Sequence, residues 1–260
     1  MNRVDACEQQ VAALFGERPN TGEGNNPELI QMLQRLIFGQ ISQIGPLDDQ
    51  ARELITCVVL SAYQTLPQLR VHARAALHVG LTPLTLREAV YGCMPLIGCP
   101  RTLNAIAVVD EVLAEHGHSL PLERAASVRE ETRETMGREM SAAVGGEGFF
   151  AGADLLSGQL AAGVEDMLTS YYFGDFYTRR GLEPKMRTLL DLVVLIALSS
   201  GEQALCAAAK RCLNTGNTAK ELCGAILHAL PYTGIPQALS ALQVIRPLIT
   251  ASAAVERPVE

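Results

Sequence analysis

An internal repeat limits the fold of this chain more than any other feature of its sequence. A shift of 135 residues aligns the segment 38–60 with 173–195, and after one inserted residue a shift of 136 aligns 77–105 with 213–241. Matched Gly and Pro residues fix turns as well as fill space. Such a repeat predicts two copies of one domain. We expect them at residues 1–120 and 121–260.

Both copies are predicted to be helical. In the first copy, Asp48 is a suitable N-cap, and the apolar residues of 52–63 lack the alternation of a surface strand. A second helix is expected over 67–80, and Thr82 caps a third. Strand signals are almost absent, so the expected class is all-α. A charged helix is expected from about Leu122, between the copies.

Charge and hydropathy exclude two classes of partner. The net charge is -7, which gives no general attraction to nucleic acid or to anionic membranes. The longest apolar run, 189–198, is far shorter than the roughly 20 residues that a membrane span requires. The N-terminus also lacks the apolar stretch of a signal peptide. A soluble, cytoplasmic protein is expected.

The seven cysteines form no CxxC pair, and five His residues are scattered among them. Neither zinc-finger spacing nor a dithiol redox motif can be drawn from this pattern. No metal site is predicted, and most of the cysteines, including Cys93 and Cys99, are expected to be packing residues.

Several segments resemble the carboxymuconolactone decarboxylase-like family, which includes alkylhydroperoxidase D. The first copy carries FGQISQIGPLDDQARELITCVVLSAY, VHARAALHVGLTPLTLREAV and PLIGCPRTLNAI, and the second carries FGDFYTRRGLEPKMRTLLDLVVLIAL and LNTGNTAKELCGAILHALPYTGIPQALSAL. The HxRAAL stretch is the most specific part. The resemblance implies two tandem alkylhydroperoxidase D-like helical bundles. It also implies a homo-oligomer, with three chains forming a trimer that is a pseudo-hexamer.

The peroxidase branch of this family uses a CxxC pair followed by a His. Placing that His on His72 would put the two cysteines at Thr65 and Gln68, where neither exists. A thiol peroxidase needs one thiolate to attack peroxide and a second thiol to resolve the product, so this reaction is not supported. It remains an alternative that would have to use isolated cysteines.

His72 and Glu53 are the candidate catalytic residues. His72 lies in an otherwise apolar helical stripe that is expected to face inward, where an imidazole could transfer a proton. Glu53 heads a stripe on the preceding helix, so a hairpin would bring its carboxylate beside the imidazole. It also matches the position of the relay Glu in the peroxidase branch. Two plainer readings stay open: a core His bonded to a backbone carbonyl, and a Glu favoured by the helix dipole.

Three further residues are candidate substrate contacts. Arg74 lies about 200° around the helix from His72, so both cannot point squarely into one pocket. An ion pair at a repeat or subunit interface is its simpler role, and a clamp on a substrate carboxylate is the other. Gln68 and Cys57 are expected to line the same cavity as His72. The other four His residues, at 78, 116, 118 and 228, are interpreted as surface or structural.

The second copy lacks this pair. Ala208 takes the place of His72, Thr188 that of Glu53 and Cys206 that of Arg70. We therefore predict a degenerate copy that supplies architecture and one wall of the first copy's pocket.

The resemblance implies a cofactor-free decarboxylase or related lyase that acts on a small carboxylated lactone or similar acid. In this scheme His72 is the general acid and Glu53 sets its tautomer or charge. Leu69, Leu60 and Ala76 form the apolar wall that desolvates the leaving carboxylate. No metal or organic cofactor is required. The alternative from another class is a non-catalytic oligomeric binding or structural protein.

Overall fold

The computed structural model describes residues 1–16, 24–146 and 155–255. Within these ranges the chain is helical and has no β-strand, which confirms the predicted all-α class. The N-terminal helices are α1 (Arg3–Phe15), α2 (Pro27–Ile37), the short 3-10 helix η1 (Ile41–Gln43), α3 (Asp49–Tyr63), α4 (Leu66–His78), α5 (Pro83–Gly92), α6 (Met94–Ile97) and α7 (Cys99–Glu115). The C-terminal helices are α8 (Arg133–Val144), α9 (Gly158–Asp166), the π-helix η3 (Met167–Tyr177), α10 (Pro184–Ala197), α11 (Glu202–Asn214), α12 (Ala219–Thr233) and α13 (Ile235–Val255).

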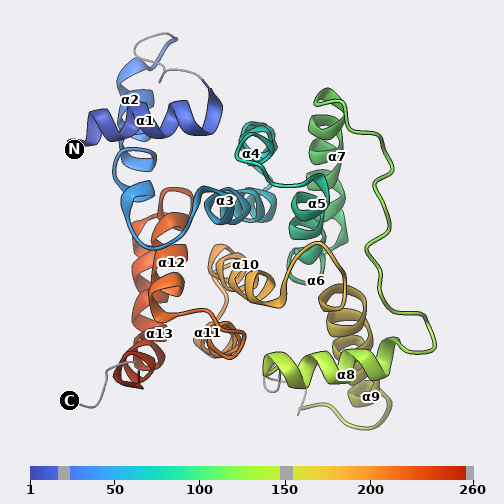
Figure 1. Ribbon diagram of the computed structural model, residues 1–260. Coiled ribbons are helices and arrows are strands. Elements are labelled where there is room, and N and C mark those ends of the chain that lie inside the picture. Colours follow the sequence, from blue (N-terminus) through green and yellow to red (C-terminus); the bar gives the residue numbers. More distant parts are fainter. Residues whose placement is uncertain (17–23, 147–154, 256–260) are drawn as a thin grey trace.

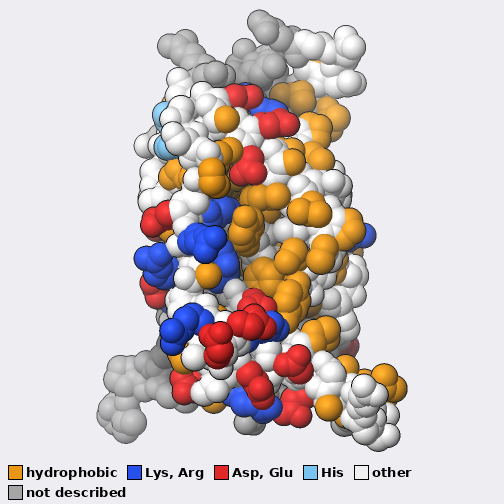
Figure 2. Space-filling view, turned by 90° about the vertical axis from the view of Figure 1, so that its right-hand side faces the viewer, with side chains coloured by type: hydrophobic (Ala, Val, Ile, Leu, Met, Phe, Trp, Pro, Cys, Tyr) orange, Lys and Arg blue, Asp and Glu red, His pale blue; other side chains and the backbone are white. Residues whose placement is uncertain are grey.

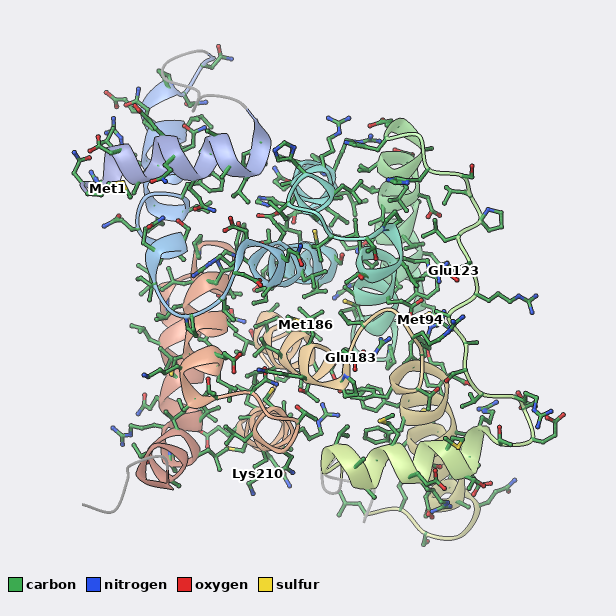
Figure 3. The ribbon with its side chains drawn as sticks, viewed as in Figure 1. Met1, Met94, Glu123, Glu183, Met186 and Lys210 are labelled. Carbon is green, nitrogen blue, oxygen red and sulfur yellow. The ribbon has the colours of Figure 1, made fainter. Side chains whose placement is uncertain are left out.

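The helices α3 and α10 lie beside each other in the middle of the molecule (Figure 1). Nearly all side chains of both helices are buried, which is typical of helices that are completely surrounded by others. Their side chains fill the space between the two halves (Figure 3) and belong to one continuous core. The two repeats are therefore joined by a shared hydrophobic core.

The remaining helices are arranged around this central pair with approximate twofold symmetry. The helices α1 and α2 lie at one corner, and α8 and α9 lie at the diagonally opposite corner (Figure 1). Two glycines at equivalent positions of the repeats each lie against the backbone of a neighbouring helix. A Cβ at Gly39 would collide with the backbone oxygen of Arg3 at the start of α1, and one at Gly174 with that of Arg133 at the start of α8. These contacts confirm the predicted tandem repeat at the level of packing.

A buried arginine in each repeat fixes the loop that precedes the central helix. Arg52 donates from Nε to the carbonyl of Leu47 at 3.1 Å, and Arg187 donates in the same way to Leu182 at 3.0 Å. A buried guanidinium needs such partners, because an unpaired charge in the core is costly. The shared spacing of Arg and Leu in the two copies thus has a structural reason.

Capping residues set several helix boundaries, and those at Asp48 and Thr82 are as predicted. The side chain of Asp48 accepts from the Ala51 amide, that of Thr82 from the Thr85 amide, and Thr218 forms a capping box with Glu221. The charged helix between the copies begins at Arg133 and not near Leu122, because 119–130 is irregular. The expected division at residue 120 falls between α7 and α8.

None of the helices in the described ranges is long and apolar enough to cross a lipid bilayer.

Candidate functional site

The helical hairpin of α3 and α4 brings His72 and Glu53 together. The Nδ1 atom of His72 lies 2.8 Å from Oε2 of Glu53, and both side chains are buried. A carboxylate can only accept, so Nδ1 carries the hydrogen of this bond. Within the described chain, Nε2 of His72 makes no hydrogen bond. The carboxylate therefore fixes the tautomer that leaves Nε2 available.

Two aromatic rings contact the imidazole edge to face. The ring of Phe15, at the end of α1, lies 6.2 Å from that of His72 at an interplanar angle of 71°. The ring of Tyr232, on α12 of the second repeat, lies 5.9 Å away at 87°. These edge-to-face contacts are favourable and restrict rotation of the ring. The second copy thus contacts the imidazole through α12, but none of its described residues lines the cavity beside His72, so the predicted wall from the second copy is not found.

An open cavity of about 630 Å³ lies beside His72, between α1, α2 and α4. Its volume is within the usual range for small-molecule sites. Nine of its lining residues are apolar: Val11, Leu14, Phe15, Ile30, Leu33, Ile37, Phe38, Val71 and Ala75. Its polar lining residues are Gln34, His72, Arg74, His78 and His116. The cavity thus combines an apolar wall with groups that can carry positive charge.

Arg74 lines the same cavity as His72, although the two side chains leave the helix in different directions. The cavity is wide enough to be reached by both. The guanidinium of Arg74 donates to Oε2 of Glu115 at 2.6 Å, across α4 and α7 of one repeat. Within this chain, Arg74 is therefore not paired across the repeat interface. Its counterpart, Lys210, is exposed on the outer side of α11 (Figure 3).

Two of the predicted contacts do not line the cavity. Gln68 is exposed on the first turns of α4, and Cys57 is completely buried in the core. Burial raises the pKa of the Cys57 thiol well above its usual value, and Glu53 adds to this effect. Helical spacing alone assigns Gln68 and Cys57 to the cavity. It does not predict where α1 and α2 pack, and these two helices form the cavity with α4.

The predicted apolar wall was also wrong. Leu69, Leu60 and Ala76 point into the shared core, and the wall of the cavity comes from α1 and α2 instead. Cys99 is exposed and not packed, whereas Cys93 is buried as expected.

The sequence interpretation missed the importance of His228. This buried residue of α12 lies against α3, where its Nδ1 is 3.3 Å from Nη1 of Arg52 and its Nε2 is 3.0 Å from Oγ1 of Thr56. Arginine can only donate, so Nδ1 accepts and Nε2 donates. Burial lowers the pKa of His228 to about 3, and the positive charge of Arg52 contributes. His228 is therefore neutral at physiological pH.

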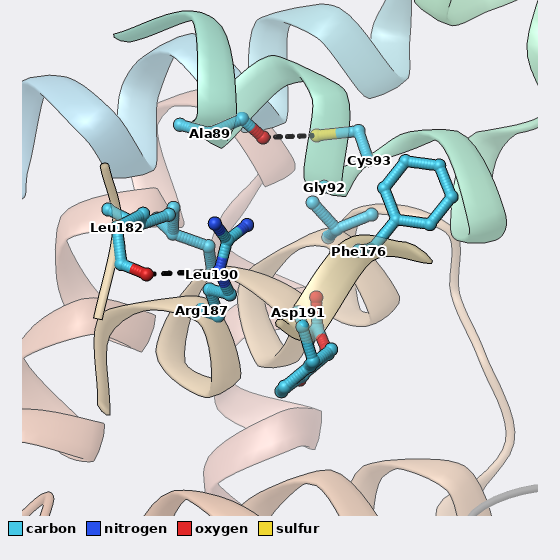
Figure 4. A pocket seen from close by; sticks show the side chains of 10 residues that line it. Ala89, Gly92, Cys93, Phe176, Leu182, Arg187, Leu190 and Asp191 are labelled. Atoms are coloured by element: carbon cyan, nitrogen blue, oxygen red, sulfur yellow. Dashed lines mark hydrogen bonds between the residues drawn. The ribbon is translucent and has the colours of Figure 1, made fainter. Parts of the chain in front are cut away.

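The equivalent place in the second repeat holds different chemistry. Asp191, at the position of Thr56, accepts hydrogen bonds from the hydroxyls of Tyr172 and Tyr177 and from Nη2 of Arg211 at 3.2 Å. The hollow beside it is lined by Arg187, Cys93 and Phe176 among others and has a volume of only about 10 Å³ (Figure 4). Among the described residues, this place in the second repeat is therefore a closed polar cluster.

Over the described ranges, no group of three or more His, Cys, Asp or Glu side chains is arranged to hold a metal ion.

The fold and the site together define a class of protein. It is a tandem helical protein with a buried His–Glu pair at a largely apolar cavity. The sequence profile of the Carboxymuconolactone decarboxylase family matches residues 27–111 and 162–247, which is well over half of the chain. The chain belongs to this family. The 4-carboxymuconolactone decarboxylase of Acinetobacter baylyi is 28% identical over 92 residues, which cover 35% of this chain and 69% of that protein.

Proposed function

We propose that this protein is a carboxy-lyase that removes carbon dioxide from a carboxylated lactone or related acid, with His72 as the proton donor. The observation that carries the proposal is the buried hydrogen bond between Glu53 and His72 at the edge of the 630 Å³ cavity. It rests further on membership of the family and on the likeness to a 4-carboxymuconolactone decarboxylase.

The reaction consumes one proton. The carbon–carboxylate bond breaks, carbon dioxide leaves, and the electron pair passes into a conjugated carbonyl of the substrate as a dienolate. The imidazolium of His72 then gives its Nε2 proton to carbon, while Glu53 compensates the positive charge. The substrate's own carbonyl is the electron sink, so this route needs no cofactor. Apolar surroundings favour loss of the hydrated carboxylate as a neutral gas.

The residues that line the cavity indicate the chemical character of the substrate. A substrate carboxylate that replaces Glu115 as the partner of Arg74 would be bound in a two-pronged geometry, and His78 and His116 add polar groups at the same cavity. The apolar wall from α1 and α2 fits a carbon skeleton or substituent larger than a bare lactone ring. We therefore expect an acid with one apolar side.

Turnover of 4-carboxymuconolactone, followed by carbon dioxide release, tests the proposal. His72→Ala should lower kcat by about 10²- to 10⁴-fold, as is usual for loss of a general acid. His118→Ala is the matched control, because His118 is exposed and does not line the cavity. Equal rates in wild type and His72→Ala would remove His72 from the mechanism.

A non-catalytic binding protein is the second candidate, and the predominance of apolar lining favours it. Saturable binding of an apolar carboxylic acid with no turnover of any carboxylated lactone would support this role.

The expected trimeric assembly is a further part of the proposal. The helix α2 exposes four large apolar side chains, Leu29, Met32, Leu33 and Leu36. A band of apolar side chains also runs beside a basic cluster on the face that carries α7 (Figure 2). Exposed apolar patches commonly mark contacts between proteins. Light scattering would give the number of chains.

A further inference from the structure

The two repeats differ in a complementary way around the candidate site. The N-terminal repeat has His72 and Glu53, but it carries Gly92 and Leu96, on α5 and α6, at the positions that correspond to His228 and Tyr232. The C-terminal repeat has lost the first pair and carries the second on α12. Because α12 packs against α3, both pairs meet at one place.

His228 organises this place from the second repeat. Its Nδ1 accepts from Arg52, and its Nε2–H donates to Thr56. The Thr56 hydroxyl accepts this bond and keeps its own hydrogen for donation to a second group. Burial raises the pKa of Tyr232, the charge of Glu53 raises it further, and the Thr56 hydroxyl lowers it. The phenol therefore stays protonated and can act as a donor.

The Tyr232 hydroxyl is buried, and although the Thr56 hydroxyl is a near neighbour, no group of the described chain lies in hydrogen-bonding geometry to it. Buried polar groups are rarely left unpaired, so this group needs an explanation. Tyr232 lines a recess of about 10 Å³, together with Glu53, Ser42 and Asp49 among others. This volume admits one water molecule, and the polar lining offers the partners that a buried water requires.

We infer that Tyr232 is a positioning residue of the N-terminal site, whose hydroxyl donates to Glu53 through a water in this recess. The water-mediated bond then fixes the Glu53 carboxylate while it accepts from Nδ1 of His72. The imidazole therefore stays in the tautomer that presents Nε2 to the cavity. The site is composite, and the C-terminal repeat completes it. This inference rests on the proposed function for its kinetic consequence but not for its geometry.

The test compares three variants of the full chain. Tyr232→Phe removes only the hydroxyl, and Tyr232→Leu installs the residue of the equivalent position 96. Ile226→Val is the control, because Ile226 is a buried core residue of the same helix that lines neither the cavity nor the recess. Long-range nitrogen–proton NMR on histidine-labelled protein reports which ring nitrogen of His72 carries the proton in the neutral form.

Wild type and Ile226→Val should show His72 protonated at Nδ1 alone, and both Tyr232 variants should show a mixture of the two tautomers. A single Nδ1 tautomer in Tyr232→Phe would overturn the inference. A change in Tyr232→Leu alone would assign the effect to ring packing and would overturn it too. A mixture of tautomers in Ile226→Val as well would show that any loss of packing has this effect. That result would also overturn the positioning role of Tyr232.

Kinetics provide a second readout if the protein turns over 4-carboxymuconolactone. Tyr232→Phe should lower kcat about 10-fold with an unchanged KM, because Tyr232 orients a catalytic group without lining the substrate cavity. A raised KM with unchanged kcat would place Tyr232 on the substrate and overturn the positioning role. Absence of turnover in wild type would count against the proposed function, and the tautomer measurement would still decide the present inference.

Discussion

Glu53 accepts a hydrogen bond from Nδ1 of His72 at 2.8 Å across a helical hairpin, and both side chains are buried. The bond orients the imidazole, and the charge of Glu53 compensates an imidazolium. Glu53→Gln keeps an acceptor of the same shape but removes the charge. We expect kcat to fall by about 10- to 100-fold, as is typical when a carboxylate behind a functional His is replaced.

The control for this substitution is Glu88→Gln. Glu88 is equally buried, but its carboxylate is bound by Arg179 at 2.7 Å and 3.0 Å, and it does not line the cavity. Its replacement should lower the melting temperature and leave kcat unchanged. Unchanged kcat in Glu53→Gln would show that only the shape of Glu53 matters.

Leu33 tests the apolar wall of the cavity. It lines the cavity from α2 and is 44% exposed, so Leu33→Ala should hardly change the stability of the fold. Loss of its contact with an apolar substrate should cost about 1 kcal/mol, which raises KM roughly 5-fold with little change in kcat. Leu29→Ala is the control, because Leu29 is exposed on the same helix outside the cavity. Equal effects of both substitutions would contradict the assignment of the wall.

The buried His228 predicts a specific dependence of stability on pH. Its pKa is lowered to about 3 by burial, whereas the unfolded chain binds a proton near pH 6.5. The unfolded state therefore binds more protons between these values, and the free energy of unfolding falls as the pH falls below about 6.5. From pH 7.5 to pH 5.5 this group alone should cost about 1 kcal/mol.

Urea unfolding of His228→Gln at both pH values checks this expectation. Glutamine can accept from Arg52 and donate to Thr56 but does not titrate, so the variant should lose about 1 kcal/mol less than wild type over the same interval. The exposed His118→Gln should behave like wild type. If the unfolding free energy of His228→Gln depends on pH as that of wild type does, the pKa of His228 is not lowered by folding.

Local sequence patterns predicted the elements and the central pair of the site. Capping residues gave the starts of several helices, and helical spacing placed His72 and Glu53 on inward faces that meet in the hairpin. These features depend on a few neighbouring residues. The loss of the pair in the second copy was also visible, because the repeat supplies its own alignment.

The cavity walls and the partner helix could not be predicted in this way. The apolar wall comes largely from α1 and α2, whose packing no spacing rule describes, so Gln68 and Cys57 were assigned to a cavity that neither of them reaches. His228 meets Thr56 over a separation of 172 residues. Such contacts depend on how the two repeats pack against each other. The repeat alignment offers one signal for His228: the equivalent position in the first copy is Gly92, so this His belongs to the second copy alone.

The cysteines should differ strongly in reactivity toward a thiol reagent. Cys99 is exposed, whereas Cys57, Cys93 and Cys212 are buried. Burial raises the pKa of Cys212 to about 12, which leaves almost no thiolate at neutral pH. Cys99→Ser should therefore remove the fastest phase of labelling in native protein, and Cys212→Ser should leave that phase unchanged. A fast phase that survives in Cys99→Ser would contradict the described exposure.

The polar cluster of the second repeat should be a determinant of stability. The guanidinium of Arg211 is completely buried and lies 3.2 Å from Asp191. Burial raises the pKa of Asp191, and the nearby Arg211 opposes that shift. Asp191→Asn removes the carboxylate charge beside the buried guanidinium of Arg211, which should cost about 3–5 kcal/mol of unfolding free energy in denaturant titrations.

Two comparisons separate the charge from the packing in this cluster. Asp175→Asn breaks a half-exposed ion pair with Arg133 in the same repeat and should cost at most about 1 kcal/mol. The double variant Asp191→Leu with Arg211→Met removes both charges and should regain most of the loss, since well-packed apolar pairs commonly replace buried ion pairs. If the double variant is no more stable than Asp191→Asn, the hydrogen bonds of Tyr172 and Tyr177, and not the lost carboxylate charge, account for the loss.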